Sequence, residues 1–348
     1  MTMIEELVAK AKAEGASDIH LVCGLPPKYR LSGDVVNMAE TPLTEEDCFA
    51  VARYLCGVAY DEFERVGEFD GADTFAGNRC RIHLFKQQGV PSLALRLLRE
   101  EIPVLEHLNL PPAVAPLVDL HKGIVLVTGE TGSGKSTTLA ALIDCVNHRY
   151  YRHIVTLEDP VEYVYKPDKC VINQREIGKD TMSFAAGLRA SLREDPNVIL
   201  IGEMRDRETI ETAITAAETG HLVFGTLHTG SASDAVDRIV QVFPEGAQTQ
   251  IRLQLSMTLQ AVLTQQLVPK KGGGRALAAE FMIVTDAIRN LIRSGNTPQI
   301  ANAIATSAAI GGQTMDQALV KLVRAGEITR ETALHYAHEP EYVKKNAI

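Results

Sequence analysis

The stretch GIVLVTGETGSGKSTTLAALI, residues 123–143, joins an apolar run to a glycine-rich turn and then to a segment with helical spacing. Residues 129–136 follow the Walker A pattern, G-x-x-x-x-G-K-S/T. Glycines in this pattern let the backbone turn tightly, so that successive N–H groups face the phosphates of a nucleotide. Because the pattern follows an apolar run and precedes a helix, the stretch predicts a P-loop that binds a nucleoside triphosphate, ATP.

The predicted nucleotide-binding residues form one continuous run. They are Gly129, Glu130, Thr131, Gly132, Ser133, Gly134, Lys135, Ser136 and Thr137. Lys135 brings a mobile positive charge to the phosphates, and the Ser136 hydroxyl is expected to ligate Mg²⁺. The following helix adds the positive end of its dipole. A glycine-rich turn without a ligand is disfavoured, because the pattern should arise by chance in about one of a hundred chains of this length.

Four apolar runs alternate with helical stretches after residue 120. They cover residues 123–129, 153–159, 197–203 and 221–228. Continuous apolar strands that alternate with helices indicate a parallel sheet covered on both faces. Ligands bind beyond the carboxyl ends of such strands, and each run ends in glycine or polar residues. The pattern therefore predicts a site at one edge of the sheet.

The run 197–203 ends in Gly202 and Glu203, where ATP-hydrolysing proteins usually carry an aspartate that holds magnesium. Hydrolysis needs a group that orients or deprotonates water near the γ-phosphate. Glu203 is the leading candidate, because it ends a strand that we expect to neighbour the P-loop strand. The alternatives are a metal-holding glutamate and a solvent-facing strand end.

The first hundred residues predict a smaller α+β unit, with helical spacing in its first fifteen residues and several short strands. Residues 99–107 are rich in charge and proline and are expected to be a linker. The predicted domains are residues 1–98 and residues 108–348. C-terminal helices are expected from about residue 285.

Composition excludes several other classes. The 348 residues carry a net charge of −9, which disfavours a protein that lives on nucleic acid. The N-terminus lacks the layout of a signal peptide, and no apolar run approaches the roughly 18 residues of a membrane helix. Six cysteines without a CxxC pair disfavour structural zinc. These features predict a cytoplasmic protein with reduced thiols.

Three segments resemble characteristic boxes of the secretion-superfamily ATPases. TLEDPVEYVY (156–165), SLREDPNVILIGEMRD (191–206) and TGHLVFGTLHT (219–229) are similar to their Asp box, Walker B segment and His box. AIRNLIRS (287–294) and GGQTMDQAL (311–319) resemble the PilT family of type IV pilus retraction ATPases. The resemblance implies a PAS-like N-terminal domain, followed by a RecA-like ATPase domain with a C-terminal helical region.

The resemblance also assigns roles at the predicted site. It makes Glu203 the catalytic base, and the missing aspartate becomes a family trait. Glu158, Asp159 and Glu162 match the acidic box that lies near the magnesium ion. Asp159 precedes a proline, so a role in the turn is an equal alternative.

Two histidines and five arginines complete the candidates. His221 and His228 match the His box, and His228, at a strand end, is expected to sense the γ-phosphate or to bridge subunits. By resemblance, arginines of the N-terminal domain reach a nucleotide across a domain or subunit interface. The alternatives are solvated strand-end arginines in the N-terminal domain and an exposed ion-pair face on the predicted helix. The five are Arg79, Arg81, Arg96, Arg189 and Arg193, of which the last two are expected on one helix.

The segment AIRNLIR matches the family motif tied to retraction. Its residues are Ala287, Ile288, Arg289, Asn290, Leu291, Ile292 and Arg293. This chain has Ser294 where the family usually has glutamate, and His83 where the family often has asparagine.

The implied function is a homohexameric motor that couples ATP hydrolysis to type IV pilus retraction and twitching motility. The implied docking partner is a pilus platform protein at the inner face of the cell membrane, and the pilin fibre is acted on indirectly. One alternative is a pilus-assembly or type II secretion ATPase, which would be expected to carry a further N-terminal domain and a tetracysteine insertion. Another is a non-hydrolytic regulatory paralogue, which would be expected to lack Glu203.

Overall fold

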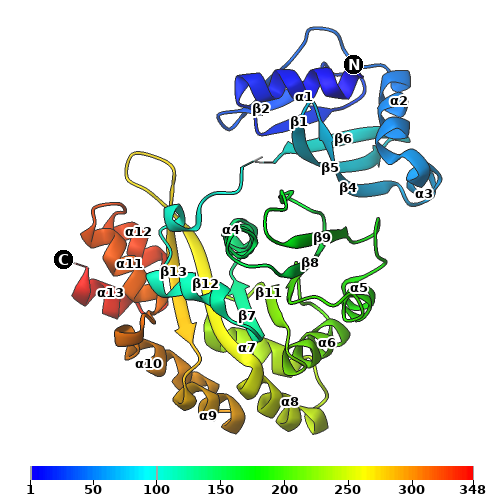
Figure 1. Cartoon of the computed structure of the whole chain (residues 1–348). Helices are drawn as coiled ribbons and strands as arrows, with labels where there is room; N and C mark the ends of the chain where they lie inside the picture. The colour runs from blue at the N-terminus through cyan, green and yellow to red at the C-terminus, as the bar shows by residue number, and fades with distance from the viewer. Residues whose placement is uncertain (1, 99–100, 348) are drawn as a thin grey trace. The chain divides into compact units, whose positions relative to one another are not determined.

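The computed structural model describes residues 2–98 and 101–347, which form two compact units. The first unit comprises Met1–Glu101 together with Asp159–Val164, and the second comprises Ile102–Glu158 and Tyr165–Ile348 (Figure 1). Residues 99 and 100, which begin the predicted linker, lie outside the described residues.

The first unit is a six-stranded antiparallel sheet with helices. Its strand order is β3-β2-β1-β6-β5-β4. The strands are β1 (Asp18–Leu21), β2 (Lys28–Leu31), β3 (Asp34–Asn37), β4 (Glu68–Phe75), β5 (Asn78–Gln87) and β6 (Val90–Leu97). The helices are α1 (Met3–Glu14), α2 (Glu45–Cys56), the 3₁₀ helix η1 (Gly57–Ala59) and α3 (Tyr60–Val66). Thr2 and Thr44 form capping boxes that begin α1 and α2.

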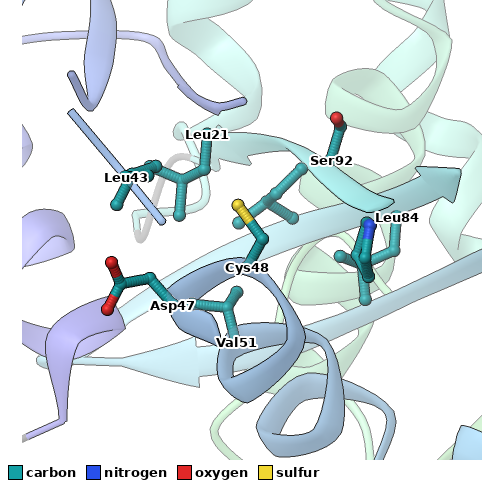
Figure 2. A pocket seen from close by; sticks show the side chains of 9 residues that line it. Leu21, Leu43, Asp47, Cys48, Val51, Leu84 and Ser92 are labelled. Carbon is teal, nitrogen blue, oxygen red and sulfur yellow. The ribbon is translucent and has the colours of Figure 1, made fainter. Parts of the chain in front are cut away.

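A small pocket of the first unit lies within its apolar core. Figure 2 shows Cys48 among Leu21, Leu43, Val51 and Leu84. Burial raises the pKa of the Cys48 thiol to about 11, so that the thiol stays protonated at neutral pH. The pocket is therefore lined by core residues.

The second unit is built on a seven-stranded sheet with the order β13-β12-β7-β11-β10-β8-β9. Neighbours from β12 to β9 are parallel, and β13 joins β12 in the antiparallel sense. The strands are β7 (Gly123–Thr128), β8 (His153–Glu158), β9 (Val171–Glu176), β10 (Val198–Ile201), β11 (Leu222–Leu227), β12 (Leu259–Pro269) and β13 (Arg275–Ile283). All residues of β7, β10 and β11 are buried, as expected for strands covered on both faces.

Helices cover this sheet and form the C-terminal region (Figure 1). The α-helices are α4 (Lys135–Arg149), α5 (Phe184–Ser191), α6 (Arg207–Glu218), α7 (Ala232–Gln241), α8 (Glu245–Thr258), α9 (Asp286–Ser294), α10 (Ile300–Ala305), α11 (Met315–Arg324), α12 (Arg330–Tyr336) and α13 (Pro340–Asn346). The 3₁₀ helices are η2 (Leu105–Leu108), η3 (Pro112–Asp119), η4 (Thr297–Gln299) and η5 (Ala308–Ile310). One core joins the central strands to α6, α7 and α8, and a second joins α11, α12 and α13 to β12 and β13.

The predicted α/β class is confirmed, but one expectation about the sheet is wrong. We expected the strand before Glu203 to neighbour the P-loop strand, whereas β11 lies between β7 and β10. Leu227 of β11 pairs with Thr128 of β7, and Gly225 pairs with Ile201 of β10. The order of strands along the chain does not set their lateral order, because the crossover through α6 brings the later strand beside β7. No helix of the described residues is long and apolar enough to cross a membrane.

Candidate active site

The P-loop begins directly after β7, where Gly129 packs against a neighbouring strand. A Cβ atom at Gly129 would lie 2.3 Å from the main-chain oxygen of Gln265, and φ of Gly129 is +137°. Gly134, with φ of +95°, precedes the first residue of α4. Residues with a side chain rarely adopt either backbone conformation, so the tight turn depends on glycine at these positions.

The start of α4 presents hydrogen-bond donors suited to phosphate. No side chain caps the N-terminus of this helix, so the N–H groups of its first turn can meet an anionic ligand. The Lys135 Nζ atom donates to the carbonyl oxygens of Gly129 (2.7 Å) and Glu130 (2.9 Å), which holds the ammonium over the loop. The Ser133 hydroxyl is buried without a hydrogen-bond partner. These donors fit the phosphates of a nucleotide.

The residues present also fit a magnesium ion that is shared with the nucleotide. Ser136 is exposed at the start of α4, where its hydroxyl can ligate a cation. Within residues 2–98 and 101–347, no cluster of three His, Cys, Asp or Glu side chains could hold a metal by itself. A bound cation would therefore depend on Ser136 together with phosphate oxygens and water.

Strand β12 supports the P-loop with two residues that the sequence analysis missed. The hydroxyl oxygens of Thr264 and Thr128 lie 2.9 Å apart. Gln265 donates from Nε2 to the Thr138 hydroxyl of α4 at 2.7 Å. No local pattern could have found them, because β12 lies about 130 residues after β7 and meets it only in the folded sheet.

The structure gives a physical reason for the glycine at position 202. The Gly202 N–H donates to the carbonyl oxygen of Leu157 on β8 at 2.7 Å. A Cβ atom at Gly202 would lie 3.0 Å from that oxygen and 3.3 Å from the Cα atom of Glu158. An aspartate here would press on the main chain of β8, so this position cannot carry the usual metal-holding side chain without a shift of the strand.

Glu203 is held at the carboxyl edge of the sheet and faces a histidine. Its Oε1 atom lies 3.0 Å from Nε2 of His228, and Arg205 contacts the same oxygen. The Glu203 side chain is 18% exposed, against 41% for His228, so the carboxylate is the more enclosed partner. The main chain is fixed nearby, because the Met204 N–H donates to the Thr226 oxygen at 3.1 Å. This arrangement orients a carboxylate that can accept a proton.

The sheet order places these groups along one edge. The P-loop follows β7, His228 directly follows β11, and Glu203 follows β10 with Gly202 between them. Figure 1 shows these three strands side by side. His228 therefore lies on the strand between the phosphate cradle and the candidate base.

The acidic box is divided between the two units. Glu158 ends β8, and its Oε1 atom accepts hydrogen bonds from Thr156 (2.6 Å) and Gln174 (3.2 Å). Asp159 is exposed and Glu162 is half-buried, and both belong to the segment that groups with the first unit. Glu158 is thus the acidic-box residue that the second unit holds beside the strand ends.

His221 is not brought to this edge. It precedes β11, and its Nδ1 atom lies 2.9 Å from the carbonyl oxygen of Ala216. With a rise of about 3.3 Å per residue, His221 and His228 are separated by roughly 20 Å along the strand. The two histidines of the predicted His box therefore lie at opposite ends of β11.

The arginines of the first unit are distributed over two strands. Arg79 and Arg81 lie on β5, and Arg96 lies on β6 opposite Arg81. Arg79 donates to the carbonyl oxygen of Val161 at 3.2 Å, and Arg96 pairs with Asp18 at 2.8 Å. Arg81 is exposed.

The expectation that Arg189 and Arg193 share one helix is wrong. Helix α5 ends at Ser191, and Arg193 lies in the following turn, where its N–H donates to the Ala190 oxygen at 3.0 Å. Arg189 lies on α5 and pairs with Glu208 at the start of α6. Pro196 follows shortly after Arg193, and a proline disfavours helical conformation in the residue before it, so the chain leaves the helix before this point.

The AIRNLIR motif forms α9, and its members divide by exposure. Ile288 and Ile292 are buried, Leu291 is half-buried, and Ala287, Asn290 and Arg293 are exposed. Arg289 instead caps α8: its Nη1 atom donates to the carbonyl oxygens of Ser256 (2.7 Å) and Met257 (3.3 Å). A positive charge at a helix C-terminus is stabilising, so this residue fixes α9 against α8.

Replacing Arg289 by alanine is expected to destabilise the second unit. The loss leaves the last carbonyl groups of α8 without their charged donor, at a cost of about 1–3 kcal/mol. Urea unfolding followed by circular dichroism measures this change. The matched control is Arg293→Ala on the exposed side of the same helix, which should change the free energy of unfolding by less than about 0.5 kcal/mol. Equal losses in the two variants would contradict the capping role.

A P-loop at the carboxyl edge of a parallel sheet, with a glutamate and a histidine at neighbouring strand ends, defines a P-loop nucleoside triphosphatase. Residues 90–273 match the family described as Type II/IV secretion system protein. The chain belongs to this family, and the resemblance inferred from its motifs is confirmed.

Individual relatives point to one branch of the family. The chain is 46% identical, over 97% of its length and 99% of the relative, to the type IV pilus retraction ATPase PilT of Pseudomonas aeruginosa. It is 38% identical to the type IV pilus ATPase PilU of the same organism, over 96% of this chain and 88% of the relative. The crystal structure of the pilus retraction motor PilT with bound ADP superposes with a TM-score of 0.93 and 45% identity, covering 99% of this chain and 100% of that one.

Proposed function

We propose that this protein is a motor ATPase that couples ATP hydrolysis to type IV pilus retraction. The observation that carries the proposal is the Glu203–His228 pair at the sheet edge that also holds the P-loop. A carboxylate oriented at this place can accept a proton from water, which hydrolysis requires and nucleotide binding alone does not. The likeness to PilT over nearly the whole chain supports retraction as the coupled process.

Each part of the site has a role in this proposal. The P-loop N–H groups and Lys135 bind the β- and γ-phosphates. Ser136 holds a magnesium ion, which neutralises charge on the phosphates. Glu203 orients a water molecule and accepts its proton, while His228 fixes the carboxylate through their 3.0 Å contact. Glu158 is available to hold water around the cation.

The proposed assembly is a homohexamer that docks on a pilus platform protein at the inner face of the cell membrane. Residues 1–98 are the N-terminal domain, residues 99–107 the linker and residues 108–348 the motor domain. Arg79, Arg81, Arg96, Arg189 and Arg193 are proposed to serve interfaces around the ring. The ATP and ADP states would prefer different interface geometries, so that hydrolysis would move the domains relative to one another. These rigid-body movements would then draw pilin subunits out of the fibre.

The direction of movement is tested in cells whose copy of this motor carries Glu203→Gln. If the motor retracts pili, blocked hydrolysis should leave more pili on the surface and abolish twitching. Electron microscopy of surface pili and colony spreading are the measurements. Cells with the wild-type protein and cells with Glu211→Gln, an exposed glutamate of α6, are the controls. A loss of surface pili would instead identify an assembly motor and overturn the proposal.

A further inference from the structure

Glu280 is a buried carboxyl group that the proposed chemistry does not use. It lies on β13 and is 4% exposed. Burial raises its pKa, since a charged carboxylate is poorly solvated in this position; the charge of His338 lowers the pKa, and that of Asp316 raises it. A buried ionisable group is costly to keep, so its contacts call for an explanation.

One contact leads to the candidate active site. Oε1 of Glu280 accepts a hydrogen bond from the N–H of Ala232 at 2.8 Å. Ala232 is the first residue of α7, and only residues 229–231 separate it from His228. Through this hydrogen bond, Glu280 holds in place the C-terminal end of the short loop that begins at His228.

A second contact leads to the C-terminal helices. The main chain of Phe281, next to Glu280, forms a bridge with Gln313, two residues before α11: the Phe281 N–H donates to the Gln313 oxygen at 2.8 Å, and the Gln313 N–H donates to the Phe281 oxygen at 3.1 Å. The Gln313 side chain also holds the start of α11 on β13, because its Nε2 atom donates to the Ala279 oxygen at 2.8 Å. Asp316, also buried, accepts hydrogen bonds from the N–H groups of His338 (2.9 Å) and Glu339 (3.1 Å). Figure 1 shows α11 beside β13, next to the remaining C-terminal helices.

Glu280 is also in lateral register with the end of the P-loop strand. It pairs across β13 and β12 with Thr264, which in turn pairs with Thr128 of β7. Paired residues point to the same face of a sheet, so this row connects the strand before the P-loop to the N-terminus of α7.

Helix capping alone does not account for Glu280. Helix α7 already has Ser231 as its N-cap, with the hydroxyl accepting from the Asp234 N–H at 3.1 Å. Helix α11 has Thr314 as its N-cap, in a capping box with Gln317. Each local cap accepts from the N–H of the third helical residue, whereas Glu280 reaches the N–H of Ala232, the first residue of α7, from a different strand.

We propose that Glu280 is a positioning residue: it holds the His228 loop in place against the sheet and joins it to the C-terminal helices α11–α13. The inference rests on the proposed role of the Glu203–His228 pair. A shift of α11 would move the carboxyl group that anchors Ala232, and thereby the contact between His228 and Glu203.

The test is a double-mutant cycle on the full-length protein, with ATP hydrolysis measured at saturating and limiting ATP. Glu280→Met keeps the side-chain volume but removes the acceptor oxygens, whereas Glu280→Gln keeps one. We expect Glu280→Met to lower kcat about tenfold with KM for ATP within about twofold, and Glu280→Gln to lower kcat less than about threefold. In a His228→Ala background, neither change should lower kcat by more than about twofold. Glu331→Met, at an exposed position of α12, is the control.

Each outcome separates this inference from the proposed function. If Glu280→Met lowers kcat equally with and without His228, the residue acts through general stability and the positioning role is wrong. If His228→Ala lowers kcat but neither Glu280 variant does, the positioning role alone is wrong. If His228→Ala itself leaves kcat unchanged, the proposed role of the Glu203–His228 pair is wrong, and the positioning role of Glu280, which rests on it, is wrong as well. Should Glu280→Met fail to fold by circular dichroism, Glu280→Ala, which also removes both acceptor oxygens, takes its place in the same comparison: a larger loss of kcat with His228 than without it supports the positioning role, and equal losses overturn it.

Discussion

Exchange of Glu203 for glutamine is expected to lower kcat for ATP hydrolysis by a factor of about 100 to 10,000, the usual contribution of a positioned general base. The amide keeps the shape of the side chain and its neighbour His228 but cannot accept the proton of water. Because the P-loop is untouched, the affinity for ATP should remain within about twofold of the wild-type value. Phosphate release and equilibrium binding of a fluorescent ATP analogue measure the two quantities.

The Glu203→Gln variant distinguishes a catalytic base from a metal ligand, the two chemical roles that the sequence left open for Glu203. Glu211→Gln serves as the matched control, since Glu211 is exposed on α6 and pairs with Arg207. A variant that recovers activity when magnesium is raised would indicate that Glu203 holds the metal. A variant with nearly wild-type kcat would show that the carboxylate only supports the strand end.

Replacing Lys135 by alanine is expected to weaken nucleotide binding and thereby to lower hydrolysis at limiting ATP. A hydrogen bond to a charged group contributes about 1.5–3 kcal/mol, so the dissociation constant for ATP should rise by a factor of about 10 to 150. The loop itself should also loosen, because Lys135 donates to the carbonyl oxygens of Gly129 and Glu130. Isothermal titration with ATP and hydrogen exchange of the loop N–H groups measure these effects.

The control for Lys135 is Lys271→Ala, an exposed lysine in the turn between β12 and β13. It removes the same charge from the protein without touching the P-loop, so ATP binding should stay unchanged. Equal ATP affinity of the Lys135 variant and the wild type would refute the assignment of the phosphate cradle. Together with Glu203→Gln, this pair distinguishes loss of binding from loss of chemistry.

Local sequence was sufficient wherever the chemistry depends on neighbouring residues. Residues 129–136 determine the P-loop, because the turn needs glycine at fixed places and its ligands are the N–H groups of that same run. The apolar runs gave β7, β8, β10 and β11 to within a residue or two, since burial on both faces demands continuous apolar side chains. Glu203 could be selected for the same reason: it ends such a strand.

Only the folded sheet decided how these pieces meet. The chain order of the strands could not reveal that β11 separates β7 from β10. The support of the P-loop by Thr264 and the reason for Gly202 both come from neighbouring strands that are distant in sequence. Lateral strand order is set by how crossover helices pack, and such packing is a property of the whole core. The sequence by itself therefore predicted which groups bind phosphate and accept a proton, while tertiary structure decided which of them share one edge.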